Sequence, residues 1–379
     1  MTAKTRLRLG DGQALEVVAY PAAERPLLLF PSIGEYLAYD DQAYDGFMVA
    51  SQRNAAYRQA LRVASPGRVV LDIGTGRDAL WAITAARAGA RQVYAVEAQA
   101  TVTAQAERAV RRAGLASLVQ VITGRSQDVE LPRQAGVCVS EIIGNIASAE
   151  GALATLADAR RRLCAPGCLM VPMRAQTLAA AISLGQDGPG SSGPPCGPAL
   201  AQESLGYLRR IFDQAGGPFD VRLCLSGPVA GARLTSSAVV EDLDFTRDSP
   251  DASTRSARLE VRRPGLLHGF ALWPRLQAGP GQPAVDALPE QERGWAPLYA
   301  PVSADGVRVV PGDQVQVTFT RRVTDPAGHP GYLLGARIGH PDRGFTRAGW
   351  DSPWPGAAFR SSGSYRRLFA AMGHSIRPG

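Results

Sequence analysis

Two glutamates in one short stretch are the residues of this sequence best suited to chemistry. Glu141 and Glu150 lie nine residues apart in the segment 140–151. Partners on one helical face lie three or four residues apart, so this spacing favours a loop that folds back on itself. Two converging carboxylates can hold a planar cation through parallel charge-assisted hydrogen bonds, and guanidinium matches that geometry best. Taken alone, the stretch is better explained as a turn followed by a helix whose first residues are acidic by chance.

The residues before this stretch change that balance. Residues 68–76, Arg-Val-Val-Leu-Asp-Ile-Gly-Thr-Gly, predict a buried parallel strand that ends in a glycine turn, and residues 78–88 predict a helix. Three further strands are expected at residues 92–97, 119–124 and 136–140. Repeated strand–helix alternation predicts a doubly wound parallel sheet with its ligand at the carboxyl ends of the strands. The two glutamates follow the fourth strand directly, so we expect them at that edge.

Two ligand classes fit the glycine turn. The Gly-x-Gly-x-x-Ala pattern at residues 74–79, with Glu97 downstream, matches a dinucleotide fingerprint in which the acid binds the ribose hydroxyls. S-adenosyl-L-methionine instead uses an Asp-x-Gly-x-Gly turn, which Asp72 completes. Asp78 at the helix start would repel a pyrophosphate, which prefers unencumbered amides there. We therefore favour S-adenosyl-L-methionine and keep an NAD-dependent oxidoreductase as an alternative.

Composition sets outer bounds on the protein. The chain has 379 residues with 45% hydrophobic content, enough for about two domains. We find no apolar run of roughly 18 residues and no apolar core in the first twelve residues, so we expect a cytoplasmic protein without a membrane partner. Five cysteines form no CxxC pair, and the four histidines all occur from His268 onward. This spacing gives no zinc site, and we expect no metal.

The net charge of +7 does not predict a nucleic-acid partner. Lys4 is the only lysine among 41 basic residues, a bias typical of a GC-rich bacterial genome. The arginines are spread along the chain rather than gathered in a basic stripe, which argues against nucleic-acid binding.

Several motifs occur in one fixed order from about residue 36 to residue 176. They are Arg53-x-x-x-Tyr57, Val70-Leu-Asp-Ile-Gly-Thr-Gly76, Ala88-Gly-Ala-Arg-x-Val93, Glu97, Val129-Glu-Leu-Pro132, Ser140-Glu-Ile-Ile-Gly144 through Glu150, Leu163-Cys-Ala-Pro-Gly167 and Val171-Pro172. In order and spacing this segment resembles the catalytic core of the protein arginine methyltransferase family. In that family, two glutamates of the loop after the fourth strand clamp the substrate guanidinium. The resemblance implies this role for Glu141 and Glu150. A non-catalytic binding protein of the same fold is a further alternative, but we would expect it to lack one of these glutamates or Arg53, and all three are present.

The resemblance also implies binding roles for other positions. Those for the cofactor are Arg53, Asp72, Gly74, Gly76, Glu97, Ala98, Ser126 and Gln127. Arg53 would bind the cofactor carboxylate and Glu97 the ribose, and Gln127 would accept from the adenine amino group through its amide oxygen. Those on the substrate side are Tyr36, Tyr39, Met48 and Trp295. An apparent one-residue slip leaves open whether Phe47 or Met48 takes the position in the pocket.

The chain also departs from the family pattern. Arg77-Asp78 stands where the family has a further glycine, and the loop after Glu141 reads Ile-Ile-Gly-Asn instead of carrying the usual aromatic residues. Ala152 stands where some members have methionine, and of the family's Thr-His-Trp loop only Trp295 remains, without the histidine that borders the active site. A smaller lining leaves more room around the methylated nitrogen. Free L-arginine, or another small guanidine or amine of a biosynthetic pathway, is therefore an alternative to protein arginine.

A second domain is expected after residue 172. Residues 175–183 predict a strand, residues 185–197 a flexible Gly/Ser/Pro loop, and residues 203–214 an amphipathic helix with Leu205, Leu208, Ile211 and Phe212 on one face. Short alternating strands over residues 237–322 predict an antiparallel barrel or sandwich. In the resembled family a helical arm in this region docks on a second subunit, which implies a homodimer. Such a helix otherwise packs on its own domain.

Together these features predict an α/β protein. Its parts are an N-terminal hairpin segment (1–34), a Rossmann-like class I methyltransferase domain (35–174), an antiparallel β-barrel domain with a helical arm near residues 200–216 (175–339), and a tail (340–379) that matches no pattern we recognise. The predicted activity is S-adenosyl-L-methionine-dependent N-methylation, in the EC 2.1.1 class, of a guanidine-bearing substrate such as free or peptidyl arginine.

Overall fold

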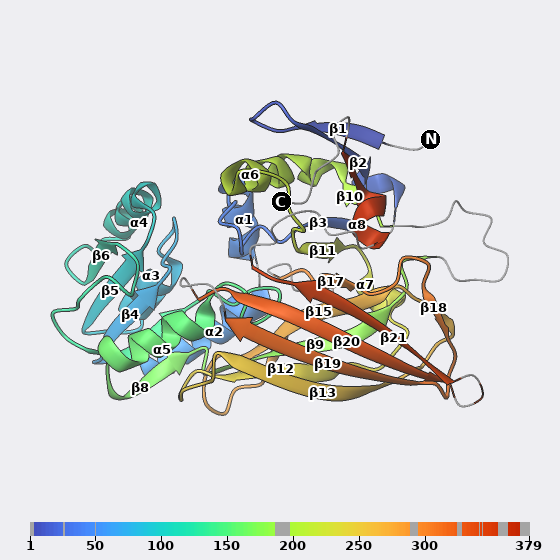
Figure 1. Ribbon diagram of the computed structural model, residues 1–379. Helices are drawn as coiled ribbons and strands as arrows, with labels where there is room; N and C mark the ends of the chain where they lie inside the picture. The colour runs from blue at the N-terminus through green and yellow to red at the C-terminus, as the bar shows by residue number, and fades with distance from the viewer. Residues whose placement is uncertain are drawn as a thin grey trace.

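The computed structural model describes residues 4–25, 27–49, 51–185, 198–288, 295–323, 328–340, 342, 344–354 and 363–371. Figure 1 shows two parts side by side: a parallel sheet flanked by helices and a larger region built mainly of strands. Most of the predicted Gly/Ser/Pro loop and the two residues before Trp295 lie outside the described residues. None of the helices in the described ranges is long and apolar enough to cross a membrane.

The first part is the predicted doubly wound sheet. Its described strands pair in the order β6-β5-β4-β7-β8, and every pair is parallel. The strands are β4 (Val69–Ile73), β5 (Gln92–Glu97), β6 (Val119–Thr123), β7 (Ala135–Ser140) and β8 (Cys164–Val171). The helices are α1 (Asp41–Val49), α2 (Ser51–Ala64), α3 (Leu80–Arg87), α4 (Ala100–Arg112) and α5 (Ala152–Arg162). The strand order reverses between β4 and β7, and a ligand crevice is expected at the carboxyl ends there.

The glycine turn after β4 is shaped by its backbone and by one buried acid. Gly74 and Gly76 have φ values of +71° and +66°, in the left-handed region that favours glycine. Asp72 is fully buried at the end of β4, where its Oδ2 accepts hydrogen bonds from the Thr75 hydroxyl at 2.6 Å and from the Ala82 amide at 2.9 Å. Asp72 thus ties the strand, the turn and the start of α3 together.

The second part is built from two larger sheets. Among the described residues, one sheet runs β1-β2-β10-β3-β11-β17-β15-β9-β12, with β16 on β15 and β22 on β2, and the other runs β13-β19-β20-β21. The first contains β1 (Lys4–Arg8), β2 (Ala14–Tyr20), β3 (Leu28–Pro31), β9 (Arg174–Ile182), β10 (Leu200–Ala201), β11 (Leu223–Ser226), β12 (Ala238–Asp244), β15 (Gly269–Gln277), β16 (Val285–Asp286), β17 (Leu298–Pro301) and β22 (Phe369–Ala371). The second contains β13 (Ala252–Glu260), β19 (Gln314–Val323), β20 (Pro330–His340) and β21 (Gly344–Ser352), and a small separate pair is β14 (Gly265–Leu267) with β18 (Val307–Val309).

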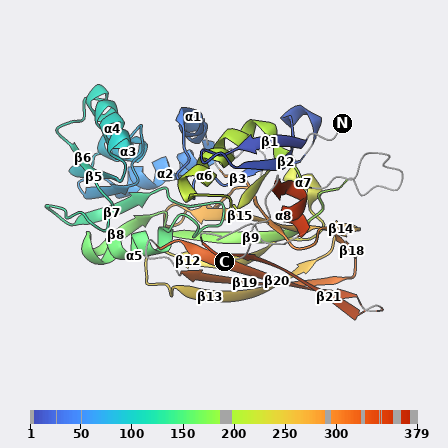
Figure 2. The ribbon, with the colours of Figure 1, turned by 45° about the horizontal axis from the view of Figure 1, so that its top comes forward.

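The two large sheets form layers around a shared apolar core. Phe270 and Leu298 of the first sheet and Phe319 and Leu334 of the second belong to one buried cluster. Figure 2 shows β9 and β15 lying above β19 and β13. The pairings keep these strands in two sheets, so the structure bears out the predicted strands without confirming a closed barrel.

The two ends of the chain meet in the first large sheet. The predicted N-terminal hairpin is present, since β1 and β2 pair antiparallel, and β2 also pairs with β22 near the C-terminus. β20 and β21 form a hairpin across the expected boundary at residue 340. A short helix, α8 (Gly363–Leu368), precedes β22.

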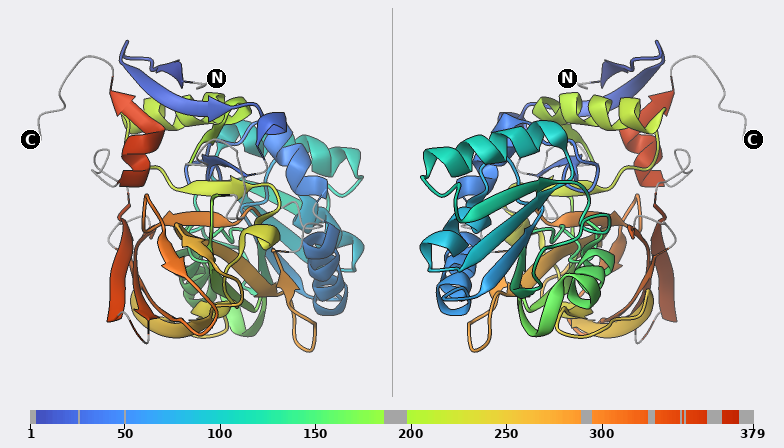
Figure 3. Two further views of the ribbon diagram at one scale, coloured as in Figure 1. Left: turned by 90° about the vertical axis from the view of Figure 1, so that its right-hand side faces the viewer. Right: turned by 90° about the vertical axis from the view of Figure 1, so that its left-hand side faces the viewer.

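The amphipathic helix is α6 (Leu205–Ala215), and it packs on its own chain. Its apolar residues Leu208, Ile211 and Phe212 are buried in the main core, and the N-terminal hairpin lies over it (Figure 3). Asp213 accepts a hydrogen bond from the Gly10 amide at 2.7 Å. The apolar face is therefore already covered, and a projecting dimerisation arm is not confirmed. The remaining short helices are η1 (Ala22–Glu24), η2 (Gln202–Ser204) and α7 (Val229–Ala232).

Candidate active site

A cavity of about 440 Å³ lies at the carboxyl ends of the parallel strands. Its lining comes from the segment that leads into α1, the turn after β4, the ends of β5 and β6, and the loop after β7. Ten residues singled out from the sequence line it: Tyr39, Met48, Gly74, Gly76, Glu97, Ala98, Ser126, Gln127, Glu141 and Glu150. Six of the eight residues expected to bind a cofactor thus share one space with the two glutamates.

Four other predicted residues lie behind this lining. Asp72 shapes the glycine turn, as described above. Arg53 and Trp295 pack behind Glu141, and the Tyr36 hydroxyl accepts a hydrogen bond from the Arg222 amide at 3.0 Å. In this structure these four residues lie outside the cavity lining, and their direct contacts with a ligand stay predictions.

Glu97 is fixed at the end of β5 by backbone donors. Its Oε2 accepts from the Gly76 amide at 3.1 Å and its Oε1 from the Gln99 amide at 3.0 Å. The side chain is buried yet lines the cavity. A carboxylate held in this way joins the glycine turn to the second strand and presents acceptor oxygens to hydroxyl groups in the cavity.

Glu141 has a buried positive charge behind it. Its Oε2 lies 3.7 Å from Nη1 of Arg53, and the two side chains are 5% and 0% exposed. The Arg53 guanidinium also lies 5.0 Å from the centre of the Trp295 ring, and the Trp295 Nε1 donates to the Ile143 carbonyl at 2.8 Å. These contacts fix the position of Arg53, and its positive charge offsets part of the cost of burying the Glu141 carboxylate.

Glu150 has the opposite environment. Burial, together with the negative charges of Glu141 and Glu35, raises its pKa to about 8 in spite of the opposing effect of Arg53. Burial and the negative charges of Glu150 and Glu141 also raise the pKa of the Tyr39 phenol well above its usual range. A cation that enters beside such a carboxyl group stabilises its ionised form, because the cation offsets both the repulsion by nearby negative charges and the cost of burying the charge.

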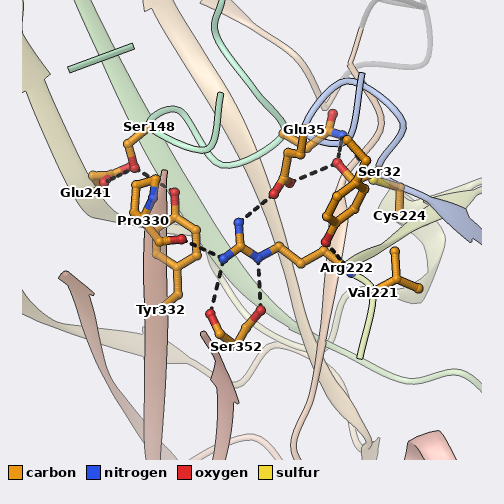
Figure 4. Close-up of polar contacts among 12 residues, drawn as sticks. Ser32, Glu35, Ser148, Val221, Arg222, Cys224, Glu241, Pro330, Tyr332 and Ser352 are labelled. Atoms are coloured by element: carbon orange, nitrogen blue, oxygen red, sulfur yellow. Dashed lines mark hydrogen bonds and ion pairs between the residues drawn. The ribbon is translucent and has the colours of Figure 1, made fainter. Parts of the chain in front are cut away.

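Hydrogen bonds at both ends fix the loop that carries the glutamates. At its start, the Ser140 hydroxyl donates to the Ile73 carbonyl at 2.8 Å, and the Tyr57 hydroxyl donates to the Ser140 carbonyl at 3.1 Å. Near its end, the Ser148 hydroxyl donates to Glu241 Oε1 at 2.7 Å (Figure 4). The loop is irregular until α5 begins at Ala152. The prediction of a folded-back loop is confirmed.

Sequence reasoning missed several residues of the cavity lining. His329, just before β20, and Gly34, just after β3, both line it. Arg77 lines it too and donates to Asp41 at 2.8 Å and Asp45 at 2.7 Å, which holds α1 over the glycine turn. Neither His329 nor Gly34 lies in a recognisable motif, and only the tertiary fold brings them to the glutamates.

Comparisons with known proteins agree with this geometry, although no family model matches the chain. A probable protein arginine N-methyltransferase 6 of Arabidopsis thaliana is 37% identical over 134 residues, which are 35% of this chain and 30% of that protein. An arginine N(omega)-methyltransferase of Streptomyces achromogenes subsp. streptozoticus is 27% identical over 272 residues, or 66% of this chain and 70% of that protein. The resemblance to the arginine methyltransferases is confirmed. The chain nevertheless spans less than half the length of the first three curated relatives that it matches.

Solved structures show the same fold. Arabidopsis thaliana protein arginine methyltransferase 10 aligns with a TM-score of 0.66 at 19% identity over 84% of this chain and 99% of that one. A PRMT1 enzyme–prozyme heterotetramer of Trypanosoma brucei, in complex with AdoHcy, aligns with a TM-score of 0.61 at 18% identity over 81% and 97% of the two chains. The similarity in fold between this chain and these two structures therefore extends over most of the chain.

Proposed function

We propose that this protein is an S-adenosyl-L-methionine-dependent N-methyltransferase whose acceptor is a guanidinium held by Glu141 and Glu150. One observation carries the proposal: both carboxylates line the same cavity as Glu97 and the glycine turn. The names of the relatives and the AdoHcy in a neighbouring structure support it.

The donor groups of the cavity fit this cofactor. Glu97 offers acceptor oxygens for ribose hydroxyls, and Ser126 and Gln127 offer polar groups for the edge of a base. Asp78 also lines the cavity, at the start of α3, where a dinucleotide would place its pyrophosphate. That negative charge favours a cofactor without phosphate. When bound, the cofactor supplies an activated methyl group on a sulfonium.

Arg53 has two candidate roles in this proposal. The family resemblance assigns it to the cofactor carboxylate, and the structure places it 3.7 Å from Glu141. We propose that it keeps Glu141 charged and oriented while remaining within the buried wall next to the cofactor. In either role its positive charge serves the methyl-donor end of the site.

The two glutamates would act by position and charge. A guanidinium is a weak nucleophile because its lone pairs are delocalised and its pKa exceeds about 12. Methyl transfer is an in-line displacement, so the acceptor nitrogen must lie opposite the sulfur. Paired carboxylates fix the plane of the guanidinium and draw its positive charge away from the attacking nitrogen. The attacking nitrogen must also lose one proton, and because that N–H becomes strongly acidic as the N–C bond forms, Glu141 or Glu150 could accept it without acting as a strong base.

The acceptor itself remains a choice between two classes. A protein arginine is the acceptor that most of the relatives' names indicate, whereas the Streptomyces relative is named for arginine alone. Free L-arginine or another small guanidine is therefore the second candidate. A homodimer is proposed only by analogy with oligomeric neighbours, and its contacts would have to use surfaces other than the covered face of α6.

The direct test supplies labelled S-adenosyl-L-methionine together with free L-arginine or an arginine-rich peptide. We expect label in a methylated guanidine, identified by mass spectrometry of the product. Thermal-shift titration with S-adenosylhomocysteine and with NAD tests the cofactor, and we expect only the first to raise the melting temperature. Stabilisation by NAD alone would replace this proposal with the oxidoreductase.

A further inference from the structure

Three aromatic rings form a stacked column, and the ring at one end, His329, lines the cavity that Glu150 also lines. The rings of His329 and Trp354 lie 4.6 Å apart at an interplanar angle of 17°, and those of Trp354 and Tyr36 lie 5.0 Å apart at 7°. His329 lines the cavity together with Glu150, whereas Tyr36 lies in the buried wall. The column therefore forms part of the cavity wall near the glutamates and extends away from it.

A single buried arginine holds the three chain segments that carry these rings. Figure 4 shows the Arg222 guanidinium donating in three directions. Nη1 donates to Glu35 Oε2 at 2.5 Å, Nη2 to the Pro330 carbonyl at 2.7 Å, and Nε to the Ser352 hydroxyl at 2.9 Å. Glu35 and Arg222 are each 1% exposed. A buried pair with this many hydrogen bonds fixes its surroundings, because separating it would strand a charge without solvent.

Each of these three contacts sets the position of one ring. Glu35 directly precedes Tyr36, Pro330 directly follows His329, and Ser352 lies two residues before Trp354. The Arg222 guanidinium also lies 5.4 Å from the centre of the Trp354 ring. The three segments that carry the rings are thus tied to one buried ion pair.

The same held segment forms a second boundary of the cavity. Gly34, next to Glu35, lines the cavity so closely that a Cβ there would lie 2.4 Å from Glu150 Oε1 and 2.5 Å from the Tyr39 hydroxyl. Gly34 therefore lies against Glu150, and Gly328, next to His329, packs against Ala154 in the first turn of the helix that follows Glu150. An acceptor must enter between walls whose positions are set by one ion pair.

We propose that the column of His329, Trp354 and Tyr36 determines acceptor specificity and restricts the acceptor to a small, free guanidine. This inference rests on the proposed function and names the substrate class of the same site. A wall held in this way would admit a planar guanidinium on a short stem and would exclude a polypeptide that extends to both sides of it.

The experiment compares kcat/KM for free L-arginine with that for a short peptide carrying one arginine and blocked ends. We expect the protein to prefer the free amino acid by about 100-fold, the range that steric exclusion from a pocket can provide. Trp354→Ala and His329→Ala should each reduce that preference by about 10-fold, mainly through a lower KM for the peptide. Phe345→Ala is the control, because Phe345 is on the same hairpin but 47% exposed.

Two further readouts make each outcome decisive. Binding of S-adenosylhomocysteine and the melting temperature show whether each variant is folded. If Trp354→Ala does not fold, His329→Ala still tests the column, because it does not remove any group that Arg222 contacts. Methylation of the peptide as efficiently as of arginine, or an unchanged preference in both variants, overturns the column and leaves the proposed function standing. If neither compound is methylated and neither binds in the presence of S-adenosylhomocysteine, the result contradicts both the proposed function and the role of the column.

Discussion

Gly34 lies directly against the carboxylate of Glu150. A Cβ built on Gly34 would come within 2.4 Å of Glu150 Oε1, a distance that real Cβ contacts do not reach. The close approach lets the segment after β3 press the carboxylate into the cavity. Both atoms that would clash, Glu150 Oε1 and the Tyr39 hydroxyl, are at the far ends of side chains and can therefore move.

Gly34→Ala should damage turnover more than stability. The added methyl displaces the Glu150 carboxylate by about 1 Å, and misplacement on that scale costs on the order of 100-fold in rate. The melting temperature should change little, because the backbone is not obstructed. Steady-state kinetics and thermal unfolding check the two halves of the prediction. Gly46→Ala on α1 is the control, since a Cβ there meets no atom within 4 Å. Normal turnover in Gly34→Ala would show that Glu150 need not occupy this position.

The rate of the proposed reaction should rise with pH through about 8. Burial and nearby negative charge raise the pKa of Glu150 to about 8, so below that pH the free protein carries it mainly in the neutral form. Binding of a guanidinium requires the carboxylate, and the acceptor stays cationic because its pKa exceeds about 12. We therefore expect kcat/KM to increase from pH 6.5 and level off above the pKa, as a profile of the free enzyme. A flat profile between pH 6.5 and 9 would contradict the role of an ionised Glu150.

Glu97→Ala should weaken cofactor binding more than it weakens the fold. The substitution removes the carboxylate that faces the cavity, and with it the acceptor for the Gly76 and Gln99 amides. Loss of charge-assisted hydrogen bonds of about 1.5–3 kcal/mol corresponds to roughly 10- to 100-fold in affinity for S-adenosylhomocysteine. Isothermal titration calorimetry measures it. Glu107→Ala on α4 is a matched control, because its ion pair with Arg111 is exposed. Equal affinities in both variants would remove Glu97 from the cofactor site.

Breaking the Arg222–Glu35 pair from one side should be costly. Arg222→Met leaves the Glu35 carboxylate buried without its counter-charge, which typically costs about 3–5 kcal/mol of stability. Adding Glu35→Gln removes that stranded charge and should restore part of the loss. Urea denaturation of the two single variants and the double variant gives the coupling energy. Additive losses would mean that the two side chains do not depend on each other.

The parallel-sheet region could be predicted from sequence because its signals are local. Residues 68–76 form one buried run that ends in glycines, and the helix and the next strand follow within about twenty residues. The position of the loop with Glu141 and Glu150 was likewise predictable, because the loop directly follows the strand β7 in the sequence. Such short-range patterns determine which strand ends converge.

Other parts of the site depend on contacts that no local pattern encodes. Arg222 and Glu35 are 187 residues apart, and neither stands in a recognisable motif. His329 reaches the cavity only because the β20–β21 hairpin packs beside the parallel-sheet region. The amphipathic pattern of α6 predicted a buried face but not the partner, which is this chain's own core. Arg53 and Asp72 were placed at the site, yet their burial behind the lining followed only from three-dimensional packing.

The most direct test of the central claim is the rate of methyl transfer to a guanidine by Glu150→Gln. Glutamine keeps the size of the side chain but cannot complete a pair of carboxylates around the cation. We expect turnover to fall by about 1,000-fold, the upper range for losing one electrostatic group of a catalytic site, with affinity for S-adenosylhomocysteine changed less than threefold. A near-normal rate in this variant would contradict the guanidinium clamp.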